Sequence, residues 1–370
     1  MSICITKYNC ICNIGRNIDE VYKNALSGIS DKFEYRQDVI KNKTLCIGVV
    51  DDNDVVIDNE DYNLKCNRLL VECIYPIKNY IDSLIIKHGK NRIGIVVATT
   101  NTGVNEFEQT QKEIHSQIGN SAMFLREYLG LESYYTGVST ACTSGIKAFS
   151  IARDLIKSGF NDAVIVAGTD TLSNVPLFGF SALEVLSGEK TNPLSKNRSG
   201  INIGEGTAVF VVEKSNKGIE IMGIGETTDT YHSTSPDPNA VEAIRAIKIA
   251  LDDAQIAQDK VDYINLHGTG SIANDITETK AISQIFDKTY VSATKPLTGH
   301  CLGAAACVET ALCCALIEKG GYYKHIYDGE YDVSLPNLNI YNPPKRTNIC
   351  MNNAFGFGGT NAIMIIGRQD

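Results

Sequence analysis

The sequence contains no block of like charge. Of its 370 residues 21% are charged, and the net charge is −9. A general nucleic-acid-binding surface is therefore not expected. The twelve cysteines form no Cys-x-x-Cys pair, which argues against a zinc ribbon and against a thioredoxin-type redox site.

Secretory signals and long hydrophobic runs are also missing. The first residues lack a continuous apolar segment, so we expect a cytoplasmic protein with reduced thiols. The most apolar long segment, residues 302–317, is too short to span a bilayer and carries Glu309 in its middle. We expect a buried core helix there and no membrane span.

Apolar runs typical of strands alternate with longer segments typical of helices, which predicts an α/β protein with largely parallel sheets. The expected strands are residues 45–50, 93–98, 163–167, 208–212, 219–224, 263–266 and 362–366. The expected helices are residues 71–87, 146–158, 240–254, 276–286 and 302–317. A polar joint at residues 213–218 predicts two halves, residues 1–215 and 216–370.

Cys142 has the setting of a nucleophile. It lies in Ser-Thr-Ala-Cys-Thr-Ser-Gly, residues 139–145, directly before an expected helix. The unpaired N–H groups and the dipole of a helix N-terminus stabilise negative charge, so we expect a lowered thiol pKa. A buried, inert thiol is the alternative, and we assign that role to the other eleven cysteines.

Two distant histidines stand in glycine-rich loops. His267 follows an expected strand, and His300 precedes the apolar helix that contains Glu309. A cysteine with two such histidines suggests acyl transfer through a thioester. A buried carboxylate needs a partner, and Lys295 is the nearest cation in the sequence. We expect Lys295 and Glu309 to form a buried pair, although a solvated lysine and a surface glutamate fit the pattern equally well.

The segment 353–361, Asn-Ala-Phe-Gly-Phe-Gly-Gly-Thr-Asn, predicts a hairpin whose backbone approaches a ligand. A phosphate-binding loop is disfavoured because no Lys-Ser/Thr follows and the next element is a strand. Three histidines lack any surrounding motif and are expected at the surface: His88, His115 and His325.

Six blocks, taken in order, resemble the β-ketoacyl-[acyl carrier protein] synthases, the condensing enzymes of the thiolase superfamily. The blocks are TACTS at 140–144, GINIGEG at 200–206, YHSTSPDP at 231–238, LHGTG at 266–270, TKPLTGH at 294–300 and FGFGG at 355–359. With one cysteine and two histidines, the sequence resembles the elongating synthases, whose catalytic residues are Cys-His-His. This resemblance implies a duplicated α/β thiolase-like fold with five αβαβα layers, acting as a homodimer or as a heterodimer with a second ketosynthase-like chain.

The resemblance also implies a reaction and its residues. Cys142 takes an acyl chain from acyl carrier protein, and His267 and His300 stabilise the enolate formed when malonyl-carrier protein loses carbon dioxide. The chain grows by two carbons, with no metal and no cofactor. Lys295 is implied to be catalytic, and Glu309, Thr269 and Ser271 to support the site. Phe357 is implied to bind the oxyanion and to gate the acyl pocket. Because acyl carrier proteins are acidic, we expect a basic docking site, with Lys196 and Arg198 as the candidate residues.

Two other readings remain. A thiolase that uses coenzyme A is disfavoured because Cys350 lacks the Cys-x-Gly setting of a second catalytic cysteine. A catalytically silent, chain-length-factor-like subunit is disfavoured because the nucleophile is present. Departures from the common family pattern, among them Leu194, Ser195 and Ser199, place primary fatty-acid elongation in doubt. The segments 192–206 and 301–315 most resemble ketosynthases of specialised pathways such as aryl polyene biosynthesis.

Overall fold

The computed structural model describes residues 1–29, 32–52 and 54–368. Its strands are β1 (Ser2–Cys12), β2 (Phe33–Arg36), β3 (Leu45–Gly48), β4 (Ile93–Ala98), β5 (Tyr135–Val138), β6 (Ala163–Asp170), β7 (Gly206–Ser215), β8 (Ile219–Thr228), β9 (Tyr263–Leu266), β10 (Tyr290–Ala293), β11 (Ile349–Phe355) and β12 (Thr360–Gly367).

The helices are α1 (Ile18–Ser27), α2 (Lys65–Ile74), α3 (Lys78–His88), α4 (Val104–Thr110), α5 (Glu113–Ser116), α6 (Asn120–Tyr128), α7 (Ser144–Lys157), α8 (Asn174–Ala182), α9 (Val241–Ala254), α10 (Ile272–Ser283), α11 (Lys295–Thr298) and α12 (Ala305–Lys319). Short 3-10 turns are η1 (Tyr75–Ile77), η2 (Gln258–Lys260) and η3 (Leu302–Ala304).

The ten-stranded main sheet consists of two halves with the same pattern of strand pairings. Its strand order is β10-β9-β11-β12-β8-β1-β7-β6-β4-β5. Read inward from each edge, both halves contain two parallel pairings followed by two antiparallel pairings, and β1 and β8 join in the middle. This repetition confirms the expected duplicated fold. The division at residues 215 and 216 stays a prediction, because the halves share one sheet.

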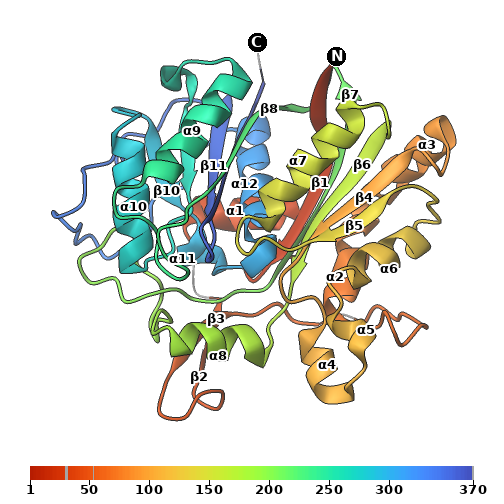
Figure 1. Ribbon diagram of the computed structural model, residues 1–370, viewed down its shortest axis with the longest axis horizontal. Coiled ribbons are helices and arrows are strands. Elements are labelled where there is room, and N and C mark those ends of the chain that lie inside the picture. The colour runs from red at the N-terminus through yellow and green to blue at the C-terminus, as the bar shows by residue number, and fades with distance from the viewer. Residues whose placement is uncertain (30–31, 53, 369–370) are drawn as a thin grey trace.

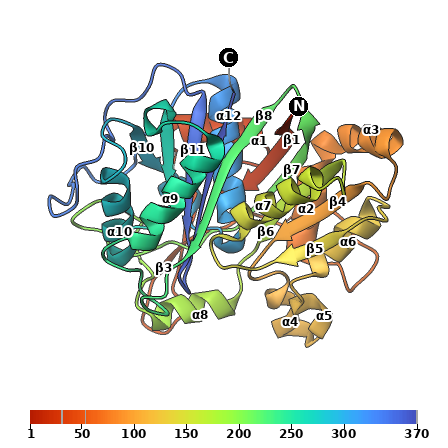
Figure 2. The ribbon, with the colours of Figure 1, turned by 45° about the horizontal axis from the view of Figure 1, so that its top comes forward.

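Five layers follow from how the helices cover the sheet (Figures 1 and 2). Helices α2, α3 and α6 pack on the outer face of the first half, and α9 and α10 cover the second half. Helices α7 and α12 lie between the halves and contact strands of both. Strands covered on both faces are apolar throughout, as in β4, where Val96 enters the central cluster and Val97 an outer one.

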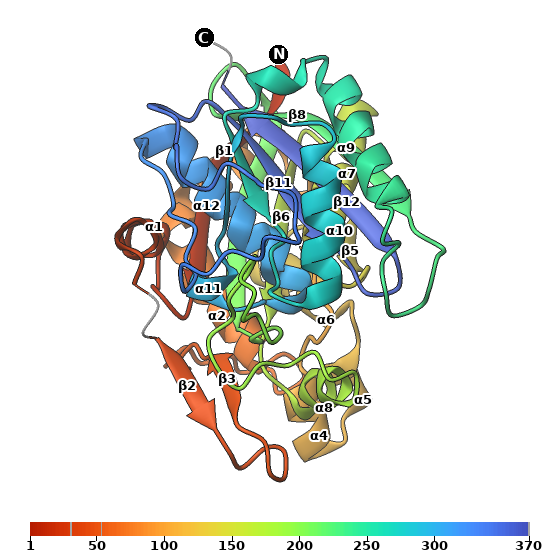
Figure 3. The same cartoon turned by 90° about the vertical axis from the view of Figure 1, so that its left-hand side faces the viewer.

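A smaller layer lies at the end of the molecule away from both termini. It contains the β2–β3 hairpin, α4 and α8 (Figure 3). The buried side chains here include Ile47, Leu177 and Leu302, so this layer packs against the turn that follows His300.

Several element boundaries differ from the sequence-based prediction. The expected helix 71–87 is two helices, because Pro76 lies in the η1 turn between α2 and α3. Strands β1, β2, β5, β10 and β11 are absent from the prediction, since polar residues, charges or glycine interrupt their apolar patterns. Segment 302–317 is buried as expected, although its first turn is η3. Within the described residues no helix is long and apolar enough to cross a membrane.

Gly225 in β8 allows the helix α9 to pack directly against this strand. A Cβ on Gly225 would lie 2.0 Å from the Ala246 carbonyl oxygen of α9. Gly225→Ala should therefore lower the free energy of unfolding by about 1–3 kcal/mol, because the helix has to move away from the strand. Urea denaturation measures this. Gly179→Ala in α8 is the matched control, since nothing lies within 4 Å of its Cβ position; equal losses in both variants would contradict the packing argument.

Candidate active site

Cys142 lies on a tight turn between β5 and α7. Ala141 adopts a left-handed conformation with φ of 53°, which turns the chain sharply before the cysteine. The Ser144 hydroxyl closes the turn, accepting a hydrogen bond from Thr140 N at 2.8 Å and donating one to the Ala141 carbonyl at 2.6 Å. The thiol is 4% exposed and stands at the start of the central helix, as the sequence predicts.

His300 meets Cys142 from the other half of the fold. Its Nε2 lies 3.1 Å from Cys142 Sγ, and its Nδ1 accepts a hydrogen bond from Leu302 N at 3.0 Å. Because Nδ1 accepts, the proton of the neutral ring is assigned to Nε2, facing the sulfur. The 200–206 motif fixes the backbone here: Gly204 N donates to the His300 carbonyl at 3.0 Å, and His300 N donates to Asn202 O at 2.7 Å.

His267 completes the cluster from the end of β9. Its ring centre lies 5.3 Å from that of His300, with the planes at 89°. The Sγ atom of Cys142 and one ring nitrogen each of His267 and His300 all lie within 4.8 Å of one another. Lys295 Nζ lies 3.2 Å from His267 Nδ1. An ammonium can only donate, so the proton of this imidazole is also assigned to Nε2.

Lys295 and Glu309 form a buried ion pair behind His267. Nζ lies 2.5 Å from Oε1, and the side chains are 1% and 2% exposed. The structure therefore confirms the expected pairing of Lys295 with Glu309. Burial raises the pKa of Glu309 to about 7, although the Lys295 ammonium acts in the opposite direction.

Burial favours the neutral forms of both histidines and of the thiol. Burial lowers the pKa of His267 and of His300 well below the ordinary value, and Lys295 adds to this effect. Burial raises the pKa of Cys142 to about 11, although Lys295 and the backbone N–H groups of Phe357 and Cys142 act in the opposite direction. The expectation of a lowered thiol pKa is thus wrong, because desolvation outweighs the nearby donors.

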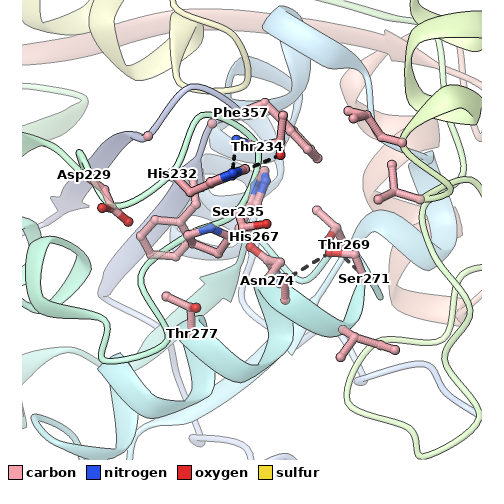
Figure 4. A pocket seen from close by; sticks show the side chains of 18 of the residues that line it. Asp229, His232, Thr234, Ser235, His267, Thr269, Ser271, Asn274, Thr277 and Phe357 are labelled. Carbon is pink, nitrogen blue, oxygen red and sulfur yellow. Dashed lines mark hydrogen bonds between the residues drawn. The ribbon is translucent and has the colours of Figure 1, made fainter.

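A cavity of about 340 Å³ leads to the cluster (Figure 4). Its lining includes His267, Thr269, Ser271, His232 and Phe357. The hydroxyl oxygens of Thr269 and Ser271 lie 3.0 Å apart on one wall. Phe357 sits in the β11–β12 turn that the 353–361 segment predicts. Neither Cys142 nor His300 is part of this lining.

Sequence models of the Beta-ketoacyl synthase N-terminal domain and C-terminal domain match residues 87–218 and 219–326. A solved chain from the complex of ketosynthase ApeO with its chain length factor ApeC, from Xenorhabdus doucetiae, is 34% identical, with a TM-score of 0.95 over 100% of this chain and 98% of that one. The chain belongs to the β-ketoacyl synthase family.

Two curated members of the family are similar to this synthase-family chain. The 3-oxoacyl-[acyl-carrier-protein] synthase 2 of Coxiella burnetii is 36% identical over 62% of this chain, which spans 61% of that relative. The protein of the same name from Staphylococcus aureus strain COL is 27% identical over 98% of this chain and 97% of the relative. The second alignment extends over nearly the whole of both chains.

The two residues expected to dock a carrier protein behave differently in this synthase-family fold. The Lys196 side chain is 57% exposed, with Nζ 2.6 Å from Glu330. Arg198 is buried and donates to Asp332 Oδ2 and to the Ser195 carbonyl. Arg198 thus stabilises a loop instead of presenting charge to a partner, a correction that its local sequence could not reveal.

Two histidines expected at the surface are buried. His115 is packed beside α4, and His325 is held between Ala293 N and the Pro193 carbonyl. His88 is half-buried beside Asp162. For His325 the local sequence gives no signal of burial, because both of its hydrogen-bond partners, Ala293 and Pro193, are more than thirty residues away.

Sequence reasoning also missed two buried carboxylates of the site. Glu278 accepts hydrogen bonds from His267 N and Gly268 N, both at 2.7 Å, and so fixes the loop that carries His267. Asp275 accepts from Leu194 N at 2.9 Å. Their spacing of three residues in α10 places them on one helix face, a signal that the pattern alone contained.

The raised pKa of Cys142 predicts how the thiol reacts. Only a thiolate attacks iodoacetamide, so the rate of Cys142 alkylation should rise about tenfold per pH unit between about pH 7 and 10. Peptide mass spectrometry at fixed times measures that rate, with free cysteine as the control, whose rate levels off above its pKa of about 8.5. A plateau near neutral pH would contradict the raised pKa.

The buried Lys295–Glu309 pair can be tested by a double-mutant cycle that measures the free energy of unfolding. Glu309→Gln should lower the free energy of unfolding by about 3–5 kcal/mol, because it leaves the Lys295 ammonium buried without its counter-ion. Urea denaturation measures the loss. The double variant Lys295→Met/Glu309→Leu removes both charges and should recover more than half of that loss. A single-variant loss below about 1 kcal/mol would show that the pair contributes little.

Proposed function

We propose that this chain is a β-ketoacyl-[acyl carrier protein] synthase, which condenses a malonyl unit with an acyl chain held on Cys142 and so lengthens it by two carbons. The carrying observation is the cluster of one thiol and two neutral imidazoles, each with Nδ1 engaged by a donor and Nε2–H facing the reaction space. Such donors stabilise a developing oxyanion without moving a proton.

The first half-reaction is thioester exchange. The sulfur of Cys142 attacks the carbonyl of the incoming acyl-carrier thioester, and the carrier thiol leaves with the cysteine proton. The negative oxygen of the tetrahedral intermediate accepts hydrogen bonds from the N–H groups of Cys142 and Phe357, the same groups that stabilise a Cys142 thiolate. Each such donor is worth about 10²–10³ in rate.

The second half-reaction forms the carbon–carbon bond. Malonyl-carrier protein enters past Thr269 and Ser271, and loss of carbon dioxide leaves an enolate whose oxygen accepts hydrogen bonds from Nε2–H of His267 and His300. The enolate carbon then attacks the Cys142 thioester, and the sulfur leaves and regains a proton. Lys295 keeps His267 in the donor tautomer, and its charge is balanced by Glu309.

Movement of the Phe357 loop is part of this proposal, because Phe357 lines the cavity whereas Cys142 does not. The Phe357 ring packs edge-to-face on Phe180 of α8, with centroids 5.2 Å apart. Gly358 next to it has φ of 90° and no atom within 4 Å of its Cβ position. A loop with this much space can swing aside to admit an acyl chain.

The proposed partners are acyl carrier protein and a second ketosynthase-like chain. Strand β5 forms one edge of the main sheet and has a single strand neighbour, β4, so its outer side can accept another strand. Likeness to the ApeO–ApeC complex supports a heterodimer, and a homodimer is the alternative. That likeness and the departures at Leu194 and Ser199 favour a specialised pathway of the aryl polyene type. Lys196 stays the proposed docking residue, because carrier proteins are acidic.

Separate assays of the two half-reactions test the proposal. Incubation with acyl-carrier thioesters of fatty and polyene type should add the acyl mass to the native chain and not to Cys142→Ala. His267→Ala should still load acyl groups but lose condensation by about 10²-fold or more, because it lacks one enolate donor. Intact-protein mass spectrometry and product analysis measure these effects. If no donor loads the chain, alone or with a co-expressed partner, it is a silent subunit.

A further inference from the structure

One buried carboxylate near the site has no role in the chemistry above. Asp170 is the last residue of β6 and is fully buried. Its oxygens accept hydrogen bonds from the loop after β4: Thr99 Oγ1 at 2.7 Å, Asn101 N at 2.8 Å and Thr100 N at 3.1 Å. A carboxylate satisfied by this many donors is held firmly in one orientation.

The same carboxylate reaches into the other half of the fold. Asp170 Oδ2 accepts a hydrogen bond from Ala304 N at 3.2 Å, in the η3 turn that opens α12. The N-terminus of α12 has no side-chain cap of its own, because its N-cap residue is Ala304 and alanine has no side-chain acceptor. Asp170 therefore supplies, from a distant strand, the negative acceptor that a helix N-terminus prefers.

The η3 turn fits closely against this anchor. A Cβ on Gly303 would lie 2.9 Å from Asp170 Oδ2 and 2.9 Å from Thr100 N. Gly303 N also donates to Thr100 Oγ1 at 3.2 Å, and that hydroxyl in turn donates to Asp170 Oδ2 at 3.2 Å. Asp170 and Thr100 thus accept hydrogen bonds from the backbone of Gly303 and Ala304, the two residues that directly follow Leu302.

Leu302 is the link to the active site. It has a left-handed φ of 52°, a conformation that is strained for a leucine and that the surroundings must enforce. Its N–H is the group that donates to His300 Nδ1. We propose that Asp170 is a positioning residue for His300: it holds the η3 turn so that Leu302 N–H stays on Nδ1 and Nε2–H stays directed at Cys142 Sγ.

The tautomer of His300 gives a test that does not require activity. Asp170→Asn in the full chain keeps the shape but replaces one acceptor oxygen with a donor amide. With ¹⁵N-labelled histidine, native His300 should show the Nε2–H tautomer, and the variant should show a mixture of tautomers. His267 should keep its signals. His300→Gln assigns the resonances, and thermal unfolding confirms that each variant is folded.

Two further variants make the result specific. Thr100→Val removes the hydroxyl between Asp170 and Gly303 and should shift His300 in the same direction, which covers the case that Asp170→Asn does not fold. Glu278→Gln is the matched control, because this carboxylate contacts the backbone of His267 and should leave the His300 signals unchanged. A native His300 tautomer in folded Asp170→Asn or Thr100→Val would overturn the proposal.

The kinetic consequence rests on the proposed function. Asp170→Asn should lower kcat for malonyl decarboxylation by about 10–100-fold, less than the loss of a whole oxyanion donor, because part of the His300 population keeps the donor tautomer. KM for malonyl-carrier protein and the rate of Cys142 acylation should change less than about threefold, because neither uses His300 as a donor. An equal loss in both half-reactions would overturn the positioning role. If the native chain has no activity, the proposed function fails, whereas the tautomer measurement still decides the role of Asp170.

Discussion

The backbone contact between the two central helices determines the rest of the site. A Cβ on Gly145 in α7 would lie 2.8 Å from Cys307 N and 2.9 Å from Ala306 Cβ in α12, so the first turns of these helices can meet only because residue 145 has no side chain. Gly168 of β6 is equally close to Cys307, with its sulfur at 2.7 Å from the Cβ position. Because Cys142 and His300 precede these helices, this contact brings a thiol and an imidazole from opposite halves within 3.1 Å.

Burial gives this site its chemical character. Desolvation keeps Cys142, His267 and His300 uncharged, and the buried Lys295 is balanced by Glu309. Fixed N–H donors can therefore respond to charge that appears on a substrate oxygen without competition from water. The same burial makes the free thiol a poor nucleophile at neutral pH, so its activation has to come from the bound thioester and the oxyanion donors around it.

Sequence patterns predicted what depends on short segments. The turn at Cys142, the loop of His267 and the hairpin around Phe357 follow from small residues and glycines at neighbouring positions. What depends on distant contacts could not be predicted. The pKa of Cys142 reflects desolvation by the whole fold, and Arg198 is buried by acidic residues more than seventy positions away. Asp170 likewise gave no signal beyond an acid at the end of an apolar strand, because its hydrogen-bond partners come from two distant segments, the loop after β4 and the η3 turn.

The four hydrophobic clusters found among the described residues contain neither Cys142 nor His267 nor His300. Cys142, although buried, thus contributes little to the apolar packing that holds the chain together. A duplicated gene could lose its cysteine by a single substitution and still encode a chain that folds and pairs. In a lineage built on this architecture, subunits that have abandoned catalysis and kept only their shape are an accessible evolutionary outcome.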